Sequence, residues 1–274
     1  MPPLVSIVTV SLNAAATIAD TCASVARQAV DFEVEHICVD GGSVDGTRAI
    51  IDRWAADSGR ITRVYEADSG IFDAMNKGLA AARGEYVLFL NADDFLASRD
   101  TLAAALQGVL PGATDSPDLI AGHVSMGRLG SSGVWRHRRV PRLLGRLPGL
   151  FPIHQGQLVK RRLLVELGGF DPRMRLASDV TLYYDLERRF RPTVRRFDAD
   201  VTFMRAGGAA NAGLRAIWLG SAEIYGHLRP IHGAARAAAM VFIKSLQSFL
   251  ELRYGKCPHE RWFSSPAPAR GMKK

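Results

Sequence analysis

Polar residues cluster directly after short apolar runs in the first hundred residues of the chain. The three clusters are residues 40–43, 68–70 and 91–94. Hard cations such as Mg2+ and Mn2+ prefer oxygen ligands and often share them with the phosphates of a substrate. The adjacent carboxylates of Asp93 and Asp94 would therefore suit a metal ion that neutralises a diphosphate leaving group. Their alternative role is to cap a helix that runs from Leu96 onward.

Three further residues are candidates for chemistry. Asp40 precedes two glycines, where backbone can approach a ligand closely, so its carboxylate could accept hydrogen bonds from a nucleobase or a ribose. Asp179 stands at an expected helix start, where it could act as a general base or simply favour the helix dipole. His154 could meet a phosphate or a metal ion. Taken singly, a structural role is the simpler explanation for each of the three.

The elements that must position these residues follow from hydrophobic patterning. Continuous apolar runs predict buried strands at residues 5–10, 34–39, 61–65 and 86–90. Helical spacing predicts helices over residues 13–28, from Thr47 onward, and over 73–82. Repeated strand–helix units predict an α/β fold with a mostly parallel sheet and right-handed crossovers. Ligands bind beyond the carboxyl ends of such strands, so the three polar clusters should lie along one edge.

The second half of the chain has weaker patterns. Residues 111–152 are rich in Gly, Pro and Ser and predict loops and short strands. Helices are expected over residues 158–167 and 180–190. Beyond Gly213 one helix should run until Pro230 breaks it, and a second should span 234–254. The tail from about Pro258 is expected to be frayed.

Charge and cysteine content narrow the class of protein. The formal charge of +8 and the pI near 9.7 indicate an acidic partner. Residues 128–146 contain six arginines and no acid, which suits either an anionic membrane or a solvated loop. Three cysteines (Cys22, Cys38 and Cys257) without zinc-site spacing predict a reducing cytoplasm. Residues 1–3 run into the first apolar stretch without a basic leader, so no signal peptide is expected.

Four segments in fixed order, 5–13, 39–47, 68–78 and 84–94, resemble family 2 glycosyltransferases of the GT-A fold. The resemblance covers roughly residues 3–205. It is strongest to bacterial transferases that build polysaccharides and glycolipids, of the colanic-acid or phenolic-glycolipid type. It implies a nucleotide-sugar donor, with UDP favoured, a divalent metal (Mn or Mg) and an inverting single displacement.

The resemblance also implies roles position by position. Asp179 resembles the catalytic base, and Asp93 the metal-binding acid, with His154 as a weaker metal candidate. Asp94, His154 and Gln155 resemble the acceptor side. The residues that resemble donor-binding positions are Thr9, Val10, Asn13, Asp40, Gly42, Ser43, Asp68, Asp73, Asn76, Lys77, Asn91 and Ala92.

Two positions depart from the family pattern. Asn91 replaces the first aspartate of the metal signature, and Met75 replaces an arginine found in many relatives. The first departure leaves open a catalytically inactive relative that serves as a scaffold in a glycan-assembly complex. The expected division is a nucleotide-sugar part over residues 1–110, an acceptor part over 111–207 and a helical C-terminal extension over 208–274.

The C-terminal extension bears on the acceptor. The apolar stretch 237–243 is too short to span a bilayer. An interfacial helix is expected instead, which would favour a lipid-linked or other saccharide acceptor at the inner face of the cytoplasmic membrane. Packing on the protein or on a dimer partner is the alternative. The residues of that expected interface are Phe242, Lys244, Leu246, Phe249, Leu250, Arg253 and Lys256.

Two other function classes fit less well. A nucleotidyltransferase would need a glycine-rich phosphate loop near the N-terminus, and residues 11–17 lack one. A nucleic-acid binder would need aromatic residues among the arginines of 128–146, where Trp135 stands alone.

Overall fold

The computed structural model describes residues 2–129, 134–139, 154–205, 214–253 and 261–264. Much of the arginine-rich segment, Cys257, Lys256 and most of the tail lie outside these residues. Within α8 the side chains of Leu246, Phe249, Leu250 and Arg253 are also outside the description.

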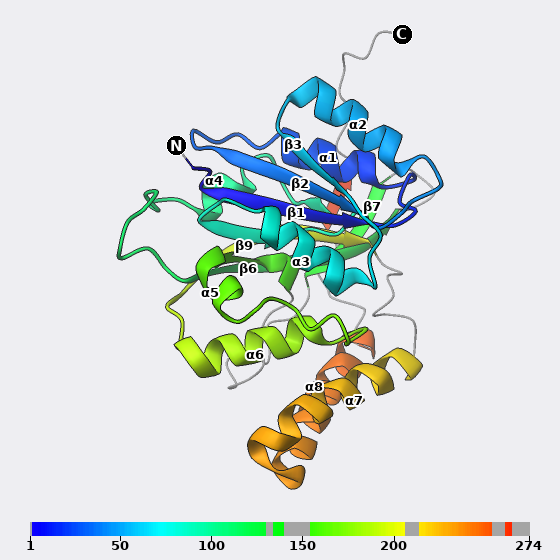
Figure 1. Ribbon diagram of the computed structural model, residues 1–274, viewed down its shortest axis with the longest axis vertical. Helices are drawn as coiled ribbons and strands as arrows, with labels where there is room; N and C mark the ends of the chain where they lie inside the picture. Colours follow the sequence, from blue (N-terminus) through cyan, green and yellow to red (C-terminus); the bar gives the residue numbers. More distant parts are fainter. Residues whose placement is uncertain (1, 130–133, 140–153, 206–213, 254–260, 265–274) are drawn as a thin grey trace.

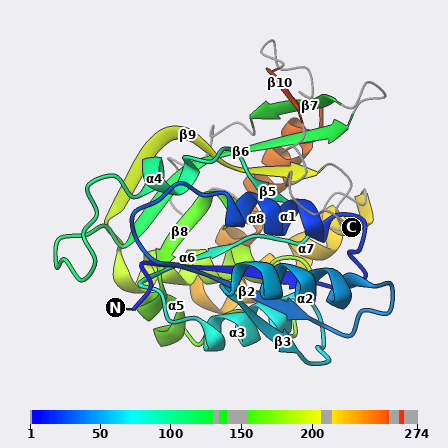
Figure 2. The same ribbon diagram turned by 90° about the horizontal axis from the view of Figure 1, so that it is seen from above.

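A ten-stranded mixed sheet forms the centre of the molecule (Figure 1). Its main path runs β10-β7-β6-β8-β4-β1-β2-β3, and β9 joins β6 and β5 beside this path. Strands β3, β2, β1 and β4 are mutually parallel. Seen from above in Figure 2, β7 and β10 lie at the far end of the sheet from β3. The strands are β1 (Val5–Ser11), β2 (Val34–Asp40), β3 (Ile61–Tyr65), β4 (Tyr86–Phe89), β5 (Phe95–Leu96), β6 (Leu119–Leu129), β7 (Val134–Arg139), β8 (Gln157–Lys160), β9 (Val194–Arg205) and β10 (Arg261–Ser264).

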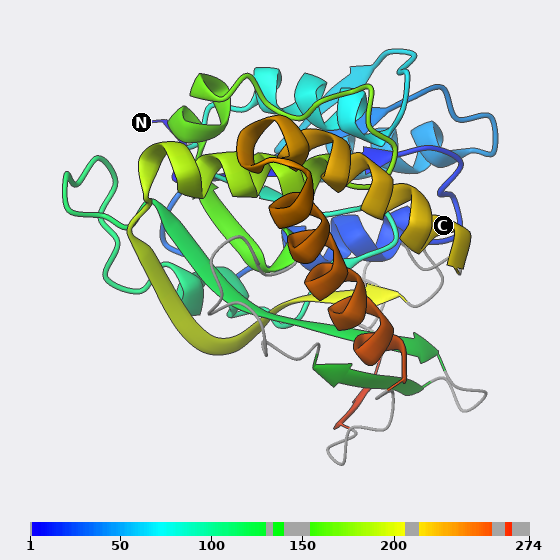
Figure 3. The same ribbon diagram turned by 90° about the horizontal axis from the view of Figure 1, so that it is seen from below.

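Helices cover both faces of the sheet, and a helical hairpin follows at the C-terminus. The helices are α1 (Ile18–Ala26), α2 (Thr47–Ser58), α3 (Ile71–Ala81), α4 (Thr101–Ala105), a 3₁₀ turn η1 (His154–Gly156), α5 (Arg161–Glu166), α6 (Ser178–Phe190), α7 (Leu214–His232) and α8 (Ala234–Arg253). Figure 1 shows the α7–α8 hairpin below α6, and in Figure 3, seen from below, the hairpin (gold to orange) lies in front. No helix in the described part of the chain combines the length and apolar composition needed to cross a bilayer.

Alternation along the strands explains why both faces are covered. On β2, Ile37 and Val39 face the core shared with α3, α5 and α6, whereas Cys38 packs with α1 and α2 on the other face. Successive strand side chains point to opposite faces, so a strand apolar at every position must be covered twice. The sequence therefore predicted the α/β class correctly, with a helical C-terminal extension.

Strand positions in the first hundred residues were predicted closely, and helix starts less so. The predicted helix beginning at Asn13 starts instead at Ile18. Asn13 has a left-handed backbone (φ 51°), and it exchanges hydrogen bonds with the next loop, to Ser43 Oγ and from the Val44 N–H. That loop-to-loop pairing holds the chain out of a helix.

The helix expected from Leu96 was also wrong. Phe95 and Leu96 form β5 and pair with Phe203 and Thr202 of β9, and α4 begins only at Thr101. The alternative of Asp93 and Asp94 as helix caps is therefore excluded.

In the second half of the chain, pairing between strands that are far apart in the sequence produced elements that the local sequence patterns did not predict. Residues 157–160 form β8 rather than a helix start, because they pair with both β4 and β6. The stretch expected as loops and short strands contains the eleven-residue β6, and β9 was not predicted. Helix α7 continues past Pro230 and ends at His232, before Gly233 with φ 79°. Within the expected frayed tail, Arg261–Ser264 pairs with β7 as β10.

Candidate functional site

The loop after β2 is organised around a buried carboxylate. Asp40 is fully buried, and its two oxygens accept hydrogen bonds from Ser11 Oγ (3.0 Å), Ser43 Oγ (2.5 Å) and Arg48 Nε (2.6 Å). The backbone N–H groups of Gly42 and Ser43 also donate to it. Burial opposes ionisation, but these hydrogen bonds outweigh it and lower the pKa of Asp40. Asp40 therefore stabilises the loop through these hydrogen bonds and does not offer a free carboxylate to a nucleobase.

The turn after β3 contacts this loop. A Cβ added to Gly41 would lie 1.9 Å from Asp68 Oδ2, so only glycine allows the two turns to touch. Asp73 accepts a hydrogen bond from the Ser69 N–H (2.9 Å) and pairs with Lys77 Nζ at 3.4 Å. These predicted donor-binding residues therefore lie together at the carboxyl end of the parallel strands.

Two other predicted donor-binding side chains are engaged elsewhere. Asn76 exchanges two hydrogen bonds of 2.8 Å with the backbone of Phe170, which fastens α3 to the loop before α6. Thr9 is fully buried, and its hydroxyl lies 2.9 Å from His36 Nε2 in the core. Both side chains therefore stabilise the structure around the site. Val10 is buried as well.

The turn after β4 carries the acidic pair. Thr21 Oγ1 of α1 lies 2.9 Å from the carbonyl oxygen of Ala92 and 2.7 Å from that of Asp94. Arg205, at the end of β9, donates from Nε to the carbonyl oxygen of Asp93 (2.7 Å) and from its backbone N–H to Asp94 Oδ1 (3.3 Å). The turn is therefore held from two sides, with Asp93 partly exposed at its tip.

Asp94 is in a different environment from its neighbour. It is 2 % exposed, and burial followed by the negative charge of Asp93 raises the pKa of Asp94 well above its ordinary value. The side-chain amide of Gln155 donates a hydrogen bond to it. A cation at Asp93 would relieve this repulsion.

Strand direction brings the second half of the chain to the same edge. Strand β8 runs antiparallel to β4, with Tyr86 opposite Lys160. Residues that precede β8 therefore lie where β4 ends. Gln155, in η1, contacts Asp94 in this way, and its own carbonyl is fixed by Thr202 Oγ1 of β9 at 2.6 Å.

His154 links this edge to α6. Its Nδ1 lies 3.0 Å from Asp179 Oδ2 at the first turn of that helix. Burial opposes ionisation of Asp179, but the hydrogen bond and charge of His154, the Val180 N–H and the charge of Lys244 lower the pKa of Asp179. The metal-signature turn, the histidine segment and the predicted base thus form one connected site, from Asp94 through Gln155 and His154 to Asp179.

The start of α6 is fixed by a residue from the C-terminal hairpin. Glu223 of α7 accepts hydrogen bonds from the backbone N–H groups of Arg175 (2.7 Å), Leu176 (3.0 Å) and Ala177 (2.9 Å). Ala177 stands at the N-cap of α6, where a side chain of this type cannot cap. The carboxylate of Glu223 performs that role from another helix.

Several buried polar atoms of the site have no hydrogen-bond partner within the described part of the protein. Buried side-chain atoms without a hydrogen-bond partner in the described structure include Asn91 Oδ1, Asp94 Oδ2, His154 Nε2, Gln155 Oε1 and Asp179 Oδ1. The amide oxygens of Asn91 and Gln155 and the carboxylate oxygen of Asp179 can only accept hydrogen bonds, which suits a ligand that brings a cation or hydroxyl groups.

These residues fit a hard divalent cation with few protein ligands. In the described part of the chain, the acids and histidine of this edge do not form a group of three ligand atoms within 4.8 Å of one another. Mg2+ and Mn2+ commonly bind through one or two carboxylates and take the remaining oxygens from phosphates and water. Asp93 is the accessible carboxylate for that purpose.

Sequence reasoning missed three residues that hold the site. Thr21 and Arg205 fasten the acidic turn, and Glu223 fastens the start of α6. Each acts across a separation of more than forty residues, so no local pattern marks it. The lone acid at position 223 between Gly207 and Leu250 was the one available signal.

Comparison with known proteins places this geometry in a family context. A family profile described as Glycosyl transferase family 2 matches residues 6–168, more than half of the chain. A PGL/p-HBAD biosynthesis glycosyltransferase of Mycobacterium tuberculosis is 40% identical over 126 residues, covering 45% of this chain and 48% of that protein. The match thus spans about half the length of such curated relatives.

Solved structures share the fold at lower identity. S. aureus TarS 1–349 in complex with UDP superposes with a TM-score of 0.60 at 18% identity, over 90% of this chain and 71% of that one. The mannosyltransferase PcManGT from Pyrobaculum calidifontis, in complex with GDP-Man and Mn2+, gives 0.61 at 23% identity, over 94% and 77%.

We expect Asp94→Asn to stabilise the metal-free protein at neutral pH. The raised pKa means that the folded state holds a proton more tightly than the unfolded chain, so wild-type stability falls as pH rises through that window. The fall is about 1.4 kcal/mol per pH unit between the two pKa values. Thermal melts from pH 4 to 8 without divalent cations should show a variant advantage that grows with pH. Asp100→Asn, an exposed acid, is the control, and a constant gap would contradict the prediction.

Glu223→Ala should loosen the start of α6. Three backbone donors lose their acceptor, which should cost about 1–3 kcal/mol. Amide hydrogen exchange should speed up selectively at residues 175–177. The matched control is Glu166→Ala, because Glu166 pairs with Arg189 at the surface with both side chains half exposed and should cost less than about 1 kcal/mol. Equal effects of the two substitutions would refute the assignment.

Proposed function

The chain belongs to glycosyl transferase family 2 and has the GT-A fold, and on that premise we propose that it transfers a sugar from a nucleotide-sugar to a saccharide or lipid-linked acceptor. The observation that carries this proposal is the connected path from Asp94 through Gln155 and His154 to Asp179, lined by unpartnered acceptor atoms. It joins the donor edge of the sheet to a carboxylate on a helix from the other half of the chain.

We assign the donor side to residues 1–110 and the acceptor side to residues 111–207. Asp40, Asp68 and Asp73 shape the two turns against which the nucleotide would lie. Solved relatives of the same fold bind UDP in one case and GDP-Man with Mn2+ in another. A UDP-sugar is the donor we favour, with GDP and dTDP sugars as the alternatives to test.

Asp93, with Asn91 and Asp94 beside it, would hold the divalent cation. His154 Nε2 is a further candidate ligand atom, because His154 is next to Gln155 and Gln155 contacts Asp94. When bound, the cation supplies charge neutralisation for the nucleoside diphosphate as it departs. Asn91 offers a neutral oxygen where the family signature, as the resemblance implies, has an acid, so weaker metal binding is expected than for a signature with two acids.

Asp179 is the proposed base of an inverting displacement. Its lowered pKa keeps the carboxylate ionised near neutral pH, so it can accept the proton of an acceptor hydroxyl. His154 holds one carboxylate oxygen at 3.0 Å, which leaves Oδ1 for the acceptor. Glu223 positions the helix turn on which Asp179 stands.

The test is nucleotide-sugar turnover by the purified full-length protein, screening UDP-, GDP- and dTDP-sugars with and without Mn2+. Release of one nucleoside diphosphate should depend on metal and be lost in Asp93→Ala. Asp179→Asn should lower transfer about 100- to 10,000-fold while donor binding persists, because a general base typically contributes that much.

Asp100→Ala is the control for removal of an acid, since that carboxylate is exposed and lies outside the site. Nucleotide binding is recorded in the same samples. Binding without turnover in the presence of acceptor sugars and lipids would favour the inactive scaffold, and failure to bind any nucleotide would overturn the enzyme proposal.

We also propose that the α7–α8 hairpin rests on an anionic membrane at the inner face of the cytoplasmic membrane. Trp218 and Phe242 are 71 % and 68 % exposed, which is unusual for large apolar side chains. Helices α7 and α8 carry five basic residues and two acids, one of which, Glu223, is engaged by backbone N–H groups. Apolar and basic groups together suit the interface of a bilayer.

Vesicle sedimentation tests this placement. The protein should bind vesicles containing phosphatidylglycerol, less so at high salt, and should not bind pure phosphatidylcholine. Trp218→Ser with Phe242→Ser should weaken binding, whereas Leu110→Ser, which alters an equally exposed apolar residue elsewhere, should not. Binding that is unaffected by the double substitution, or absent altogether, would overturn the membrane proposal.

A further inference from the structure

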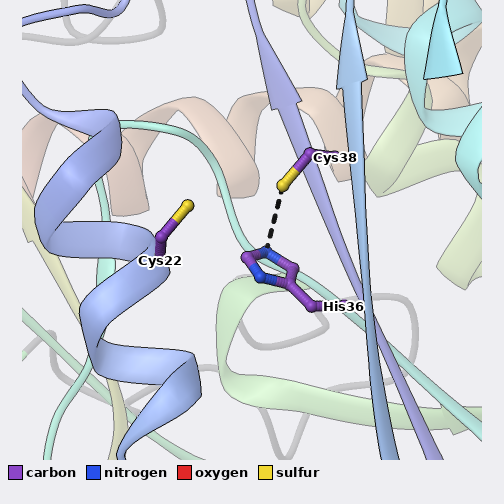
Figure 4. A group of neighbouring side chains, drawn as sticks. All are labelled: Cys22, His36 and Cys38. Carbon is purple, nitrogen blue, oxygen red and sulfur yellow. Dashed lines mark hydrogen bonds between the residues drawn. The ribbon is translucent and has the colours of Figure 1, made fainter. Parts of the chain in front are cut away.

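Two cysteines and a histidine that are separated in the sequence meet in the core (Figure 4). Cys22 comes from α1, and His36 and Cys38 come from alternate positions of β2, so both face that helix. One ligand atom from each residue lies within 4.8 Å of the others, and Cys38 Sγ is 3.6 Å from His36 Nε2. All three residues are buried, at 1 %, 3 % and 0 % exposure.

The distance between Cys38 Sγ and His36 Nε2 matches that between two ligands of a tetrahedral zinc site. Zinc binds thiolate sulfur at about 2.3 Å and imidazole nitrogen at about 2.1 Å, which places the two ligand atoms about 3.6 Å apart across a tetrahedral angle. Thr9 Oγ1, 2.9 Å from His36 Nε2, is an adjacent oxygen donor. We propose that Cys22, His36 and Cys38 bind a thiophilic divalent cation, zinc in the first instance, at a structural site distinct from the carboxylate edge.

Charge balance favours this occupant. Two thiolates and one divalent cation sum to zero, so the bound site carries no net charge into the apolar surroundings of Ile18 and Ile51. Burial lowers the pKa of His36 to about 4, so the imidazole is in its neutral, coordinating form. A cysteine binds a metal as the thiolate, so binding must release protons and should strengthen with pH.

The cluster lies directly behind the acidic turn. Ala92 packs in the same apolar cluster as Cys22 and Cys38, and the neighbouring Thr21 holds the carbonyl oxygens of Ala92 and Asp94. A cation here would join α1 to β2 beneath that turn. Hard Mn2+ or Mg2+ prefers the oxygen ligands of the edge, whereas zinc prefers the sulfur ligands of the core, so the two sites differ in metal as well as in position.

The test is cobalt substitution, which reports thiolate ligands directly. Because the ligands are buried, the metal should enter during folding, so the full-length protein is produced in medium supplemented with zinc or with cobalt. The zinc-grown protein should retain about one zinc per chain after dialysis. The cobalt-grown protein should show the near-ultraviolet thiolate-to-cobalt absorption band.

Substitutions of single residues test which side chains bind the metal. Cys22→Ser and Cys38→Ser should each lose the band and the retained metal, while Cys257→Ser and Asp93→Ala should keep both. The Asp93→Ala arm keeps this result independent of the glycosyltransferase proposal. A wild-type protein that retains no metal and shows no thiolate band, or a band that persists in Cys22→Ser and Cys38→Ser, would overturn the site and leave the two thiols as apolar core packing. The wild-type measurement decides the matter even if a variant fails to fold.

Discussion

The antiparallel pairing of β8 with β4 is the constraint on which the site depends. Parallel strands β3, β2, β1 and β4 bring their carboxyl ends to one edge, but they can contribute only residues from the first hundred. Reversing direction at β8 places the residues before that strand at the same edge. His154 and Gln155 therefore meet Asp94 and Asp179, and β9, parallel to β6, brings Arg205 to the same place.

Three buried or half-buried carboxylates show how partners rather than burial alone decide protonation. Burial disfavours the ionised form of Asp40, Asp94 and Asp179 alike. Five donors surround Asp40, and His154 donates to Asp179, so both are held ionised. Asp94 has a like charge beside it and one unpartnered oxygen, so its pKa is raised instead of lowered. An edge on which the pKa of one carboxyl is raised and that of another is lowered is suited to receiving a cation and a proton at separate positions.

The C-terminal hairpin is part of the site rather than an appendage. Its cluster of apolar contacts, formed by Ala177 and Tyr184 of the α6 region with Ile224, Leu228 and Ala237, packs beneath α6. Glu223 then reaches the first turn of that helix. Any surface that the hairpin contacts is thus connected through Glu223 and α6 to Asp179, which gives a physical route by which such an interface could hold this carboxylate in place.

The sequence by itself determined the four parallel strands and the polar residues that follow them, because alternation and turn residues act within a few positions of one another. Asp40, Asp93 and Asp179 could be chosen as candidates from those signals together with the resemblance to a family. Only the tertiary structure decided that Leu158 lies on a strand, that Asp40 is enclosed by its own loop, and that Thr21, Arg205 and Glu223 hold the site. It also brought Cys22 to Cys38. These outcomes depend on hydrogen bonds and packing between segments far apart in the chain, and such contacts leave no periodicity in the sequence from which they could be predicted.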